Sequence, residues 1–490
     1  MNMKIFTKIA LVAVATVMLA GQALAGGLLT NSNQSASFLR SLARGTTLDP
    51  DAVHTNPAGA AFMSNGFHFG INDQMAYQTR TINSTYAPFA MGAQNNGLTS
   101  KEFEGTVFSP IIPSVHFVWK HNRWAVMAGM GVNGGGGELE FDNGLGSFER
   151  MFSVLPAGMQ QLGVNATAYD LDMQLIGKSQ TLAFQVGAAF RITDWLSVAA
   201  QLRYSATSNA YEGYMKNIGV MVGGQMTPAT TIFQGALANL QAQYQQVVGT
   251  LGADSPEAQQ LMAAMQSVGA NAVKTSDHVL DVKQKGTSLS PVLALYAQKG
   301  QWAAAVKYEF KMATELEIES EPISANDPVI NTLFPNGAKV KSETPALLTV
   351  ALSRQCGPVK VTAEWHEYFD KDAENSFSSA VAGNTMEYLL GAEWQVCKKL
   401  MISAGVQRTQ TDLISANYSD MNFLTPSTSV GFGVAYNFSE KIRLNLGIMP
   451  TFYDEVTSTG VVADTQLPFT DVYDRTSLAW GIGLDFHFGK

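Results

Sequence analysis

The sequence predicts an all-β protein, a 14-stranded antiparallel transmembrane β-barrel plugged by an N-terminal hatch. Three observations lead to this prediction. Many segments alternate between apolar residues and polar or small ones, and the connections between them alternate between short and long. After the first 25 residues, no stretch supplies the roughly eighteen consecutive apolar residues that a membrane-spanning helix needs. A mean hydropathy of +0.02 suits a secreted protein as well as a barrel, so the alternation decides between the two.

The first 25 residues are typical of a secretory signal peptide. Lys4 and Lys8 give a basic start, an apolar run follows, and Ala23 to Ala25 fits a small-x-small cleavage site. We therefore expect residues 1–25 to be a signal peptide, 26–65 the hatch, and 66–490 the barrel. The barrel domain would carry long outer loops at 142–177 and 213–276.

The hatch segment contains a compact turn at Asn56, Pro57, Ala58 and Gly59. Proline fixes φ and lacks an N–H, while Asn and Gly tolerate turn conformations, so these residues should form a corner. A short helix is expected around residues 36–44. A barrel this wide needs filling, which favours a plug in the lumen; a disordered periplasmic tail is the alternative.

The alternation is clearest in the last strand. Between Leu478 and Phe488, large apolar residues occupy one face, and small or polar residues such as Asp485 occupy the other. Charged residues in other strands also keep to the second face. Because a Lys or Arg facing lipid at mid-bilayer costs roughly 2–4 kcal/mol, a membrane barrel requires this segregation. The predicted strands are 66–83, 105–120, 123–141, 178–192, 194–212, 277–299, 301–320, 342–355, 358–373, 384–397, 399–413, 427–438, 440–456 and 474–488.

Two segments resemble a known family. "LARGTTLDPDAVHTNPAGAAF" resembles the N-terminal hatch of the FadL-type outer-membrane transporters of long-chain fatty acids and other hydrophobic compounds, with Asn56, Pro57 and Ala58 in the motif positions. "IIPSVHFVWKHNRWAVMAGMGV" is similar to the second strand, tight turn and third strand of that family. The resemblance implies passive uptake: capture of a hydrophobic ligand by outer loops, binding in the lumen, and lateral release into the membrane through an inward kink in the third strand.

The third strand runs into Gly134, Gly135, Gly136 and Gly137. Glycines weaken a strand, so these four residues are the expected lateral opening. The alternative is a flexible strand end that leads into an outer loop.

The outer loops contain apolar residues that could capture a ligand. Residues 230–251 and 256–268 show helical spacing, with an N-cap at Ser255 and proline in the first turn. This helical pair could line a groove for acyl chains, or it could pack only against its own loop. The candidate capture residues are Phe148, Phe152, Phe233, Leu237, Leu240, Met262 and Met265.

A fatty acid also carries a carboxylate, which a cation in the lumen could hold. By strand parity Arg203 and Lys307 point inward on strands that flank the large loop, so they are the candidate carboxylate ligands. Alternatively, the inward charges pair with one another or with the hatch.

Two cysteines, Cys356 and Cys397, fall in inner turns at the same rim of the barrel. Export delivers them to an oxidising compartment, so we consider a disulfide between them, the alternative being two unpaired thiols beyond bridging distance.

Other function classes find little support. The net charge of −9 and the lack of basic clusters give no reason to expect nucleic acid as a partner. The sequence has no Gly-x-Ser-x-Gly elbow, no metal-spaced His/Cys cluster and no phosphate-binding loop, so we expect neither an enzyme nor a cofactor. We expect a monomer in the outer membrane of a Gram-negative bacterium, in contact with outer-membrane lipid. The runner-up function is a general or polar-solute porin.

Overall fold

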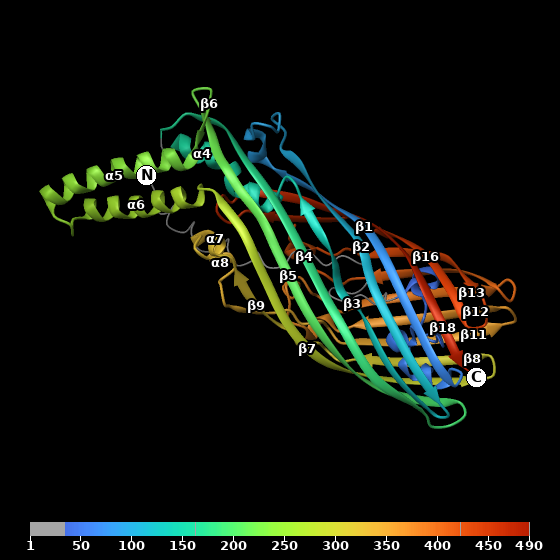
Figure 1. Cartoon of the computed structure of the whole chain (residues 1–490). Coiled ribbons are helices and arrows are strands. Elements are labelled where there is room, and N and C mark those ends of the chain that lie inside the picture. Colours follow the sequence, from blue (N-terminus) through green and yellow to red (C-terminus); the bar gives the residue numbers. More distant parts are fainter. Residues whose placement is uncertain (1–34, 162, 422, 490) are drawn as a thin grey trace.

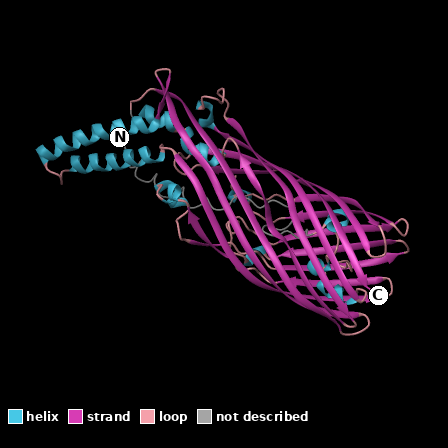
Figure 2. Ribbon diagram, viewed as in Figure 1, coloured by secondary structure: helices cyan, strands magenta, loops and turns pink. Residues whose placement is uncertain are grey.

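The computed structural model describes residues 35–161, 163–421 and 423–489. The predicted signal peptide and the first part of the predicted hatch lie outside these residues. The described residues form a closed antiparallel barrel of fourteen strands (Figure 1). The barrel closes because β1 (Gly66–Tyr86) pairs along its whole length with β18 (Pro468–Gly489). Figure 2 shows that strands make up most of the molecule.

All fourteen predicted strands are present. Three of them are divided into two pieces, namely β8 with β9, β10 with β11, and β16 with β17, and the short β6 folds back on the end of β5. The remaining strands are β2 (Ser100–His121), β3 (Trp124–Phe141), β4 (Ala166–Arg191), β5 (Leu196–Val222), β6 (Gln225–Pro228), β7 (His278–Lys299), β8 (Trp302–Glu309), β9 (Glu315–Ser320), β10 (Lys339–Lys341), β11 (Leu347–Cys356), β12 (Val359–Tyr368), β13 (Thr385–Gln395), β14 (Leu400–Gln410), β15 (Ser427–Asn437), β16 (Ile442–Tyr453) and β17 (Val456–Val461).

The predicted bounds of the two long loops are wrong at one end each. β4 begins at Ala166, so the first loop ends well before residue 177, and β5 continues to Val222. In these extensions helices α4 (Leu155–Gln161) and α5 (Ala229–Leu251) pack against the strands, and Met173 and Met215 are buried. At these ends burial no longer alternates strictly from one residue to the next, because the helices cover the sheet.

The alternation predicted for the membrane strands is confirmed. On β18, Leu478, Ile482 and Phe488 are exposed on the outer surface, whereas Ala479 and Asp485 are buried. Outward apolar residues and inward small or polar ones are the pattern of a barrel in lipid.

Helices occur in the outer loops and in the N-terminal part of the chain. Among the described residues no helix is both long enough and apolar enough to cross a membrane. The helices are α1 (Ala36–Ser41), α2 (Ala52–Thr55), η2 (Pro57–Phe62), η3 (Ala87–Met91), α3 (Gly146–Ser153), α4 (Leu155–Gln161), α5 (Ala229–Leu251), α6 (Pro256–Lys274), α7 (Pro322–Ala325), α8 (Pro328–Leu333), η4 (Asp370–Asp372) and η5 (Ser415–Asn417).

Residues 35–65, here called the N-terminal segment, lie within the barrel near the end that carries the C-terminus (Figure 1). Helix α1 contacts β13 to β16 and β18 on one side, and η2 contacts β3 to β5 and β7 on the other. The segment is almost wholly buried. It therefore spans the lumen from wall to wall.

Candidate functional site

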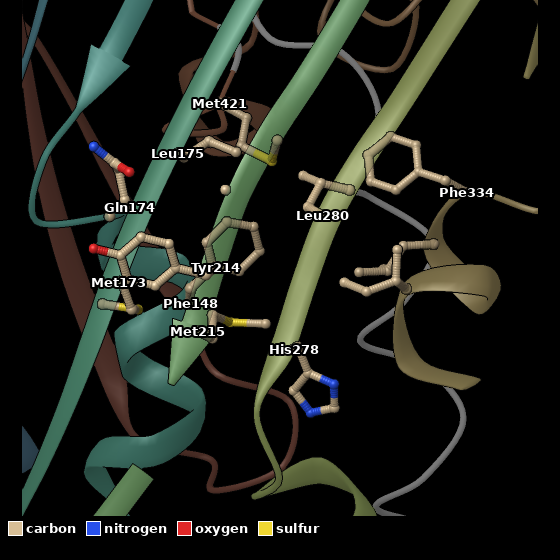
Figure 3. Close-up of a pocket in the computed structure, with 14 residues that line it drawn as sticks. Phe148, Met173, Gln174, Leu175, Tyr214, Met215, His278, Leu280, Phe334 and Met421 are labelled. Atoms are coloured by element: carbon tan, nitrogen blue, oxygen red, sulfur yellow. The ribbon is translucent and has the colours of Figure 1, made fainter. Parts of the chain in front are cut away.

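An apolar pocket lies where the outer loops meet the extended ends of β4, β5 and β7 (Figure 3). Helices α3 and α8 cover it. The pocket is narrow, but unbranched methionine side chains line it and can adapt to a ligand. Such a lining suits an apolar molecule. The lining residues are Gly144, Phe148, Met173, Gln174, Leu175, Gly213, Tyr214, Met215, His278, Leu280, Ile330, Leu333, Phe334 and Met421.

The pocket adjoins a buried apolar cluster inside the barrel. Phe334 and Met421 belong both to the pocket and to this cluster, which also contains Phe423, Tyr473 of β18 and Ile82 of β1. Packed apolar side chains thus connect the outer loops with the closing seam of the barrel.

Of the seven predicted capture residues, only Phe148 lines this pocket. Phe152 and Phe233 are buried in a separate cluster at the base of the α5–α6 hairpin, with Leu237 and Leu240 packed against it. The hairpin itself projects away from the barrel (Figure 1), and Met262 is exposed and Met265 half-buried on it. The helices and the Ser255 cap are as predicted, but they pack on their own loop and do not line this pocket.

The other pocket residues were missed by sequence reasoning. Phe334 comes from an outer segment that shows no distinctive pattern, and Leu280 lies at the start of the predicted strand 277–299, with nothing in the sequence to show that the two meet. A useful signal was the recurrence of methionine at Met173, Met215 and Met421, close to predicted strand ends.

The barrel wall is interrupted between β2 and β3. The two strands pair from His121 with Trp124 up to Ser114 with Gly131, and again at Val107 with Leu139, but residues 108–113 have no partner in the described part of β3. On β3, residues 133–135, 137 and 138 have no partner on β2 within the described pairing, and they include the predicted glycines Gly134, Gly135 and Gly137. The hydrogen-bonded sheet therefore has a gap at this point.

The glycines permit an irregular path of β3 beside the gap. Register shifts toward β4 occur between Val132 and Gly134 and between Gly135 and Gly137. Gly135 has a φ of +67°, and a Cβ there would collide with the carbonyl of Ser179. Only glycine fits such a bulge.

Apolar residues border the gap on its outer side. Phe108 and Ile111 of β2 are 56% and 68% exposed. On the inner side, Ile112 and Val132 are buried in one small cluster. A hydrophobic molecule at the gap would thus meet apolar side chains on both sides of the wall.

A second small pocket lies between β3 and the N-terminal segment. It is lined by His54 of α2 and by Gly131, Asn133 and Ala183 of the wall, among others. Burial and the neighbouring cations Lys307 and Arg203 hold the pKa of His54 well below its usual value. The pocket brings the N-terminal segment next to the unpaired stretch of β3.

The predicted motif forms a hydrogen-bonded corner. Asn56 is fully buried; its Oδ1 accepts from the Gly59 N–H at 3.2 Å and its Nδ2 donates to the Thr47 carbonyl at 3.1 Å. Pro57 stands at the first position of η2. The corner is fixed to the wall because Ser197 Oγ donates to the Ala58 carbonyl at 2.7 Å.

Charged groups bind the other half of the segment to the opposite wall. Glu393 of β13 accepts from Arg40 at 2.7 Å and from Arg44 at 3.1 Å, and Asp49 pairs with Arg443 of β16 at 2.8 Å. Burial opposes ionisation of Asp49, but Arg443 and Arg44 outweigh it and hold the pKa of this carboxyl well below its usual range. Removal of either partner from such a buried pair destabilises the fold, because the other charge is then left buried without compensation.

Arg203 and Lys307, the candidate carboxylate ligands, both point inward and are buried. Glu309 pairs with each of them, and Lys307 Nζ also donates to the His54 carbonyl at 2.9 Å. The alternative foreseen for these cations, pairing with lumen acids and with the N-terminal segment, is thus the arrangement observed.

The disulfide considered from the sequence is wrong, since Cys356 and Cys397 are both free and exposed. Cys356 ends β11, whereas Cys397 follows β13, so β12 separates them. Two inter-strand spacings amount to roughly 10 Å, which exceeds the Cα separation of about 7 Å that a disulfide allows.

The described residues contain no group of three or more His, Cys, Asp or Glu side chains that could hold a metal ion. The arrangement offers an apolar pocket, a filled lumen and a gap in the wall. These features are those of a β-barrel of the outer-membrane type that carries an apolar pocket.

Comparison with known proteins identifies the fold. No protein-family model and no curated protein matches the sequence. Among solved structures, a Pseudomonas aeruginosa FadL homologue is similar with a TM-score of 0.60 at 13% identity, over 96% of this chain and 100% of that one. The P. putida toluene transporter TodX gives a TM-score of 0.51 at 15% identity, over 91% and 95% of the two chains. The chain has the fold of the FadL-type transporters, which confirms the resemblance at the level of the fold.

Proposed function

We propose that this protein is an outer-membrane transporter for the passive uptake of hydrophobic molecules, with long-chain fatty acids as its principal substrates. The observation that carries the proposal is the unpaired stretch between β2 and β3, bordered by the exposed Phe108 and Ile111. The similar structures support it, since one is a FadL homologue and another a toluene transporter.

In this proposal the signal peptide directs the chain to the outer membrane of a Gram-negative bacterium, where it acts as a monomer. The ligand enters the pocket around Phe148 and Phe334, follows the apolar cluster inward and leaves through the gap into the lipid. Lateral exit is favourable because each methylene that stays out of water retains about 0.8 kcal/mol. The N-terminal segment serves as the hatch that blocks the axial route.

A polar-solute porin would need an open polar lumen, whereas residues 35–65 contact both sides of this one. Purified protein in liposomes distinguishes the two functions. We expect transfer of oleate into the vesicles and no swelling with arabinose. Swelling at the rate of a general porin, with no protein-dependent transfer of oleate, would contradict the proposal.

A further inference from the structure

Two arginines face each other inside the closing seam of the barrel. Arg80 of β1 and Arg475 of β18 are cross-strand partners, and each is only 2% exposed. Both belong to the inward faces of their strands, because the residues two positions away, Gln78 and Tyr473, are buried as well. Like charges directly opposite each other destabilise a sheet, so this position needs a compensating feature.

Arg475 has no such partner within the described part of the chain. Its Nε and both terminal nitrogens are buried without a hydrogen bond, and none of the ion pairs found there involves it. Its guanidinium lies over the ring of Tyr453, 4.6 Å from the centroid. A buried guanidinium that offers five N–H donors and finds no acceptor is costly.

The surrounding side chains add further donors and remove the nearby acids. Nε2 of Gln78 and the hydroxyl of Tyr453 are also buried without partners. The nearest inward acid along β18, Asp471, pairs with Arg150 at 2.8 Å, and Glu387 of β13 is bound by His366 at 2.8 Å. The site therefore has more hydrogen-bond donors than acceptors, and the nearby acids already pair with other cationic or histidine side chains.

Apolar side chains lead from this site to the outer pocket. Arg80 lies 5.6 Å from the centroid of the Phe423 ring, and Phe423 packs in the same cluster as Met421 and Phe334 of the pocket. A ligand that contacted both ends would have an anionic head and an apolar tail.

We propose that Arg475, with Arg80 beside it, binds the carboxylate of an amphipathic ligand whose tail lies along the cluster from Phe423 to the outer pocket. A carboxylate can accept two parallel hydrogen bonds from one guanidinium, and it would compensate the buried charge of Arg475. This inference rests on the proposed function, and it replaces Arg203 and Lys307, which Glu309 already engages, as the carboxylate ligands. It also separates the substrates: a fatty acid fits the site, whereas a neutral hydrocarbon would leave the Arg475 guanidinium without an acceptor.

The test measures binding of radiolabelled oleate, methyl oleate and acetate to the purified protein in nanodiscs. We expect Arg475→Gln to weaken oleate binding by roughly tenfold or more and to leave methyl oleate binding unchanged. Acetate should bind far more weakly than oleate. Arg408→Gln is the matched control, because Arg408 of β14 is partly exposed and already pairs with Asp454; it should leave oleate binding unchanged.

The thermal stability of the barrel provides a second readout. If Arg475 only supported the fold, Arg475→Gln would lower the unfolding temperature and weaken both oleate and methyl oleate. A ligand site predicts an equal or higher unfolding temperature, because an unpaired buried charge is removed. Equal effects on the two ligands, or no effect on either, would contradict the inference while leaving the proposed function intact. If the wild-type protein bound neither oleate nor methyl oleate, the proposed function itself would be wrong.

Discussion

The side chain of Asn56 closes the N-terminal segment on itself by donating to the carbonyl of Thr47 at 3.1 Å, while it caps Gly59. Asn56→Asp keeps an acceptor for Gly59 but loses the donor to Thr47, and Asn56→Ala loses both. Because an unsatisfied buried group costs roughly 1–3 kcal/mol, we expect both variants to loosen residues 47–62, with alanine the more severe.

Hydrogen exchange of the amides in residues 47–62 measures this loosening, and heat-modifiable gel mobility checks that the barrel still assembles. If the variants also took up less oleate, and the amount of assembled barrel fell by the same proportion, Asn56 would act in folding and not in a hatch.

The outer pocket should matter more for ligand capture than the projecting hairpin. Phe334 is buried and stacks on Tyr211 at 5.7 Å, so Phe334→Ala removes a large part of the apolar lining. Truncation of a buried phenylalanine costs roughly 3–5 kcal/mol of packing, and we expect oleate affinity to fall at least severalfold. Met262→Ala, on the hairpin, is the control and should bind normally. The reverse order of effects would identify the hairpin as the capture surface.

The outer loop that follows β12 should respond to pH. Asp370 accepts from the Thr385 N–H at 2.7 Å, and burial, with a smaller effect from Glu387, raises the pKa of its carboxyl to about 6. Since the folded loop favours the protonated acid, its stability is greatest at low pH and falls as the pH rises from about 4 to 6. The total change is at most about 3 kcal/mol. Hydrogen exchange of residues 370–385 at pH 4 and pH 7 measures it, and Asp370→Asn should abolish the difference.

The sequence predicted those parts of the fold that lipid dictates. Strand number, inward and outward faces, and short turns follow from alternation, because a lipid-facing charge is costly. The amphipathic spacing and the Ser255 cap predicted α5 and α6 for a similar local reason. The extensions of β4 and β5 escaped prediction because outer helices pack against them, so burial there does not alternate strictly.

The candidate site was harder to predict because it depends on which strands meet. Parity placed Arg203 and Lys307 inward, but parity alone could not tell that Glu309 lies within reach of both. Their positions in inner turns placed both cysteines at one rim without showing that β12 separates them. Arg80 and Arg475 could have been noticed, since the first and last strands of a closed barrel must pair.

The gap between β2 and β3 can be closed by a disulfide. A Cβ placed on Gly137 would lie 3.8 Å from the Cβ of Ser109, which is close to the mean Cβ separation in disulfides. Ser109→Cys with Gly137→Cys should therefore bridge the two strands in the unpaired stretch. Val107→Ala makes room for the new side chain, since a Cβ on Gly137 would collide with Val107. Replacing Cys356 and Cys397 with serine leaves only the engineered pair.

The rate of oleate transfer through this bridged protein, compared before and after reduction in the same sample, tests lateral release most directly. With the bridge verified by mass spectrometry, we expect transfer to fall by roughly tenfold or more, while oleate still binds from the outer side, and reduction to restore transfer. An unchanged rate of transfer through the fully bridged protein would contradict lateral exit at this strand and would indicate an axial path past the N-terminal segment.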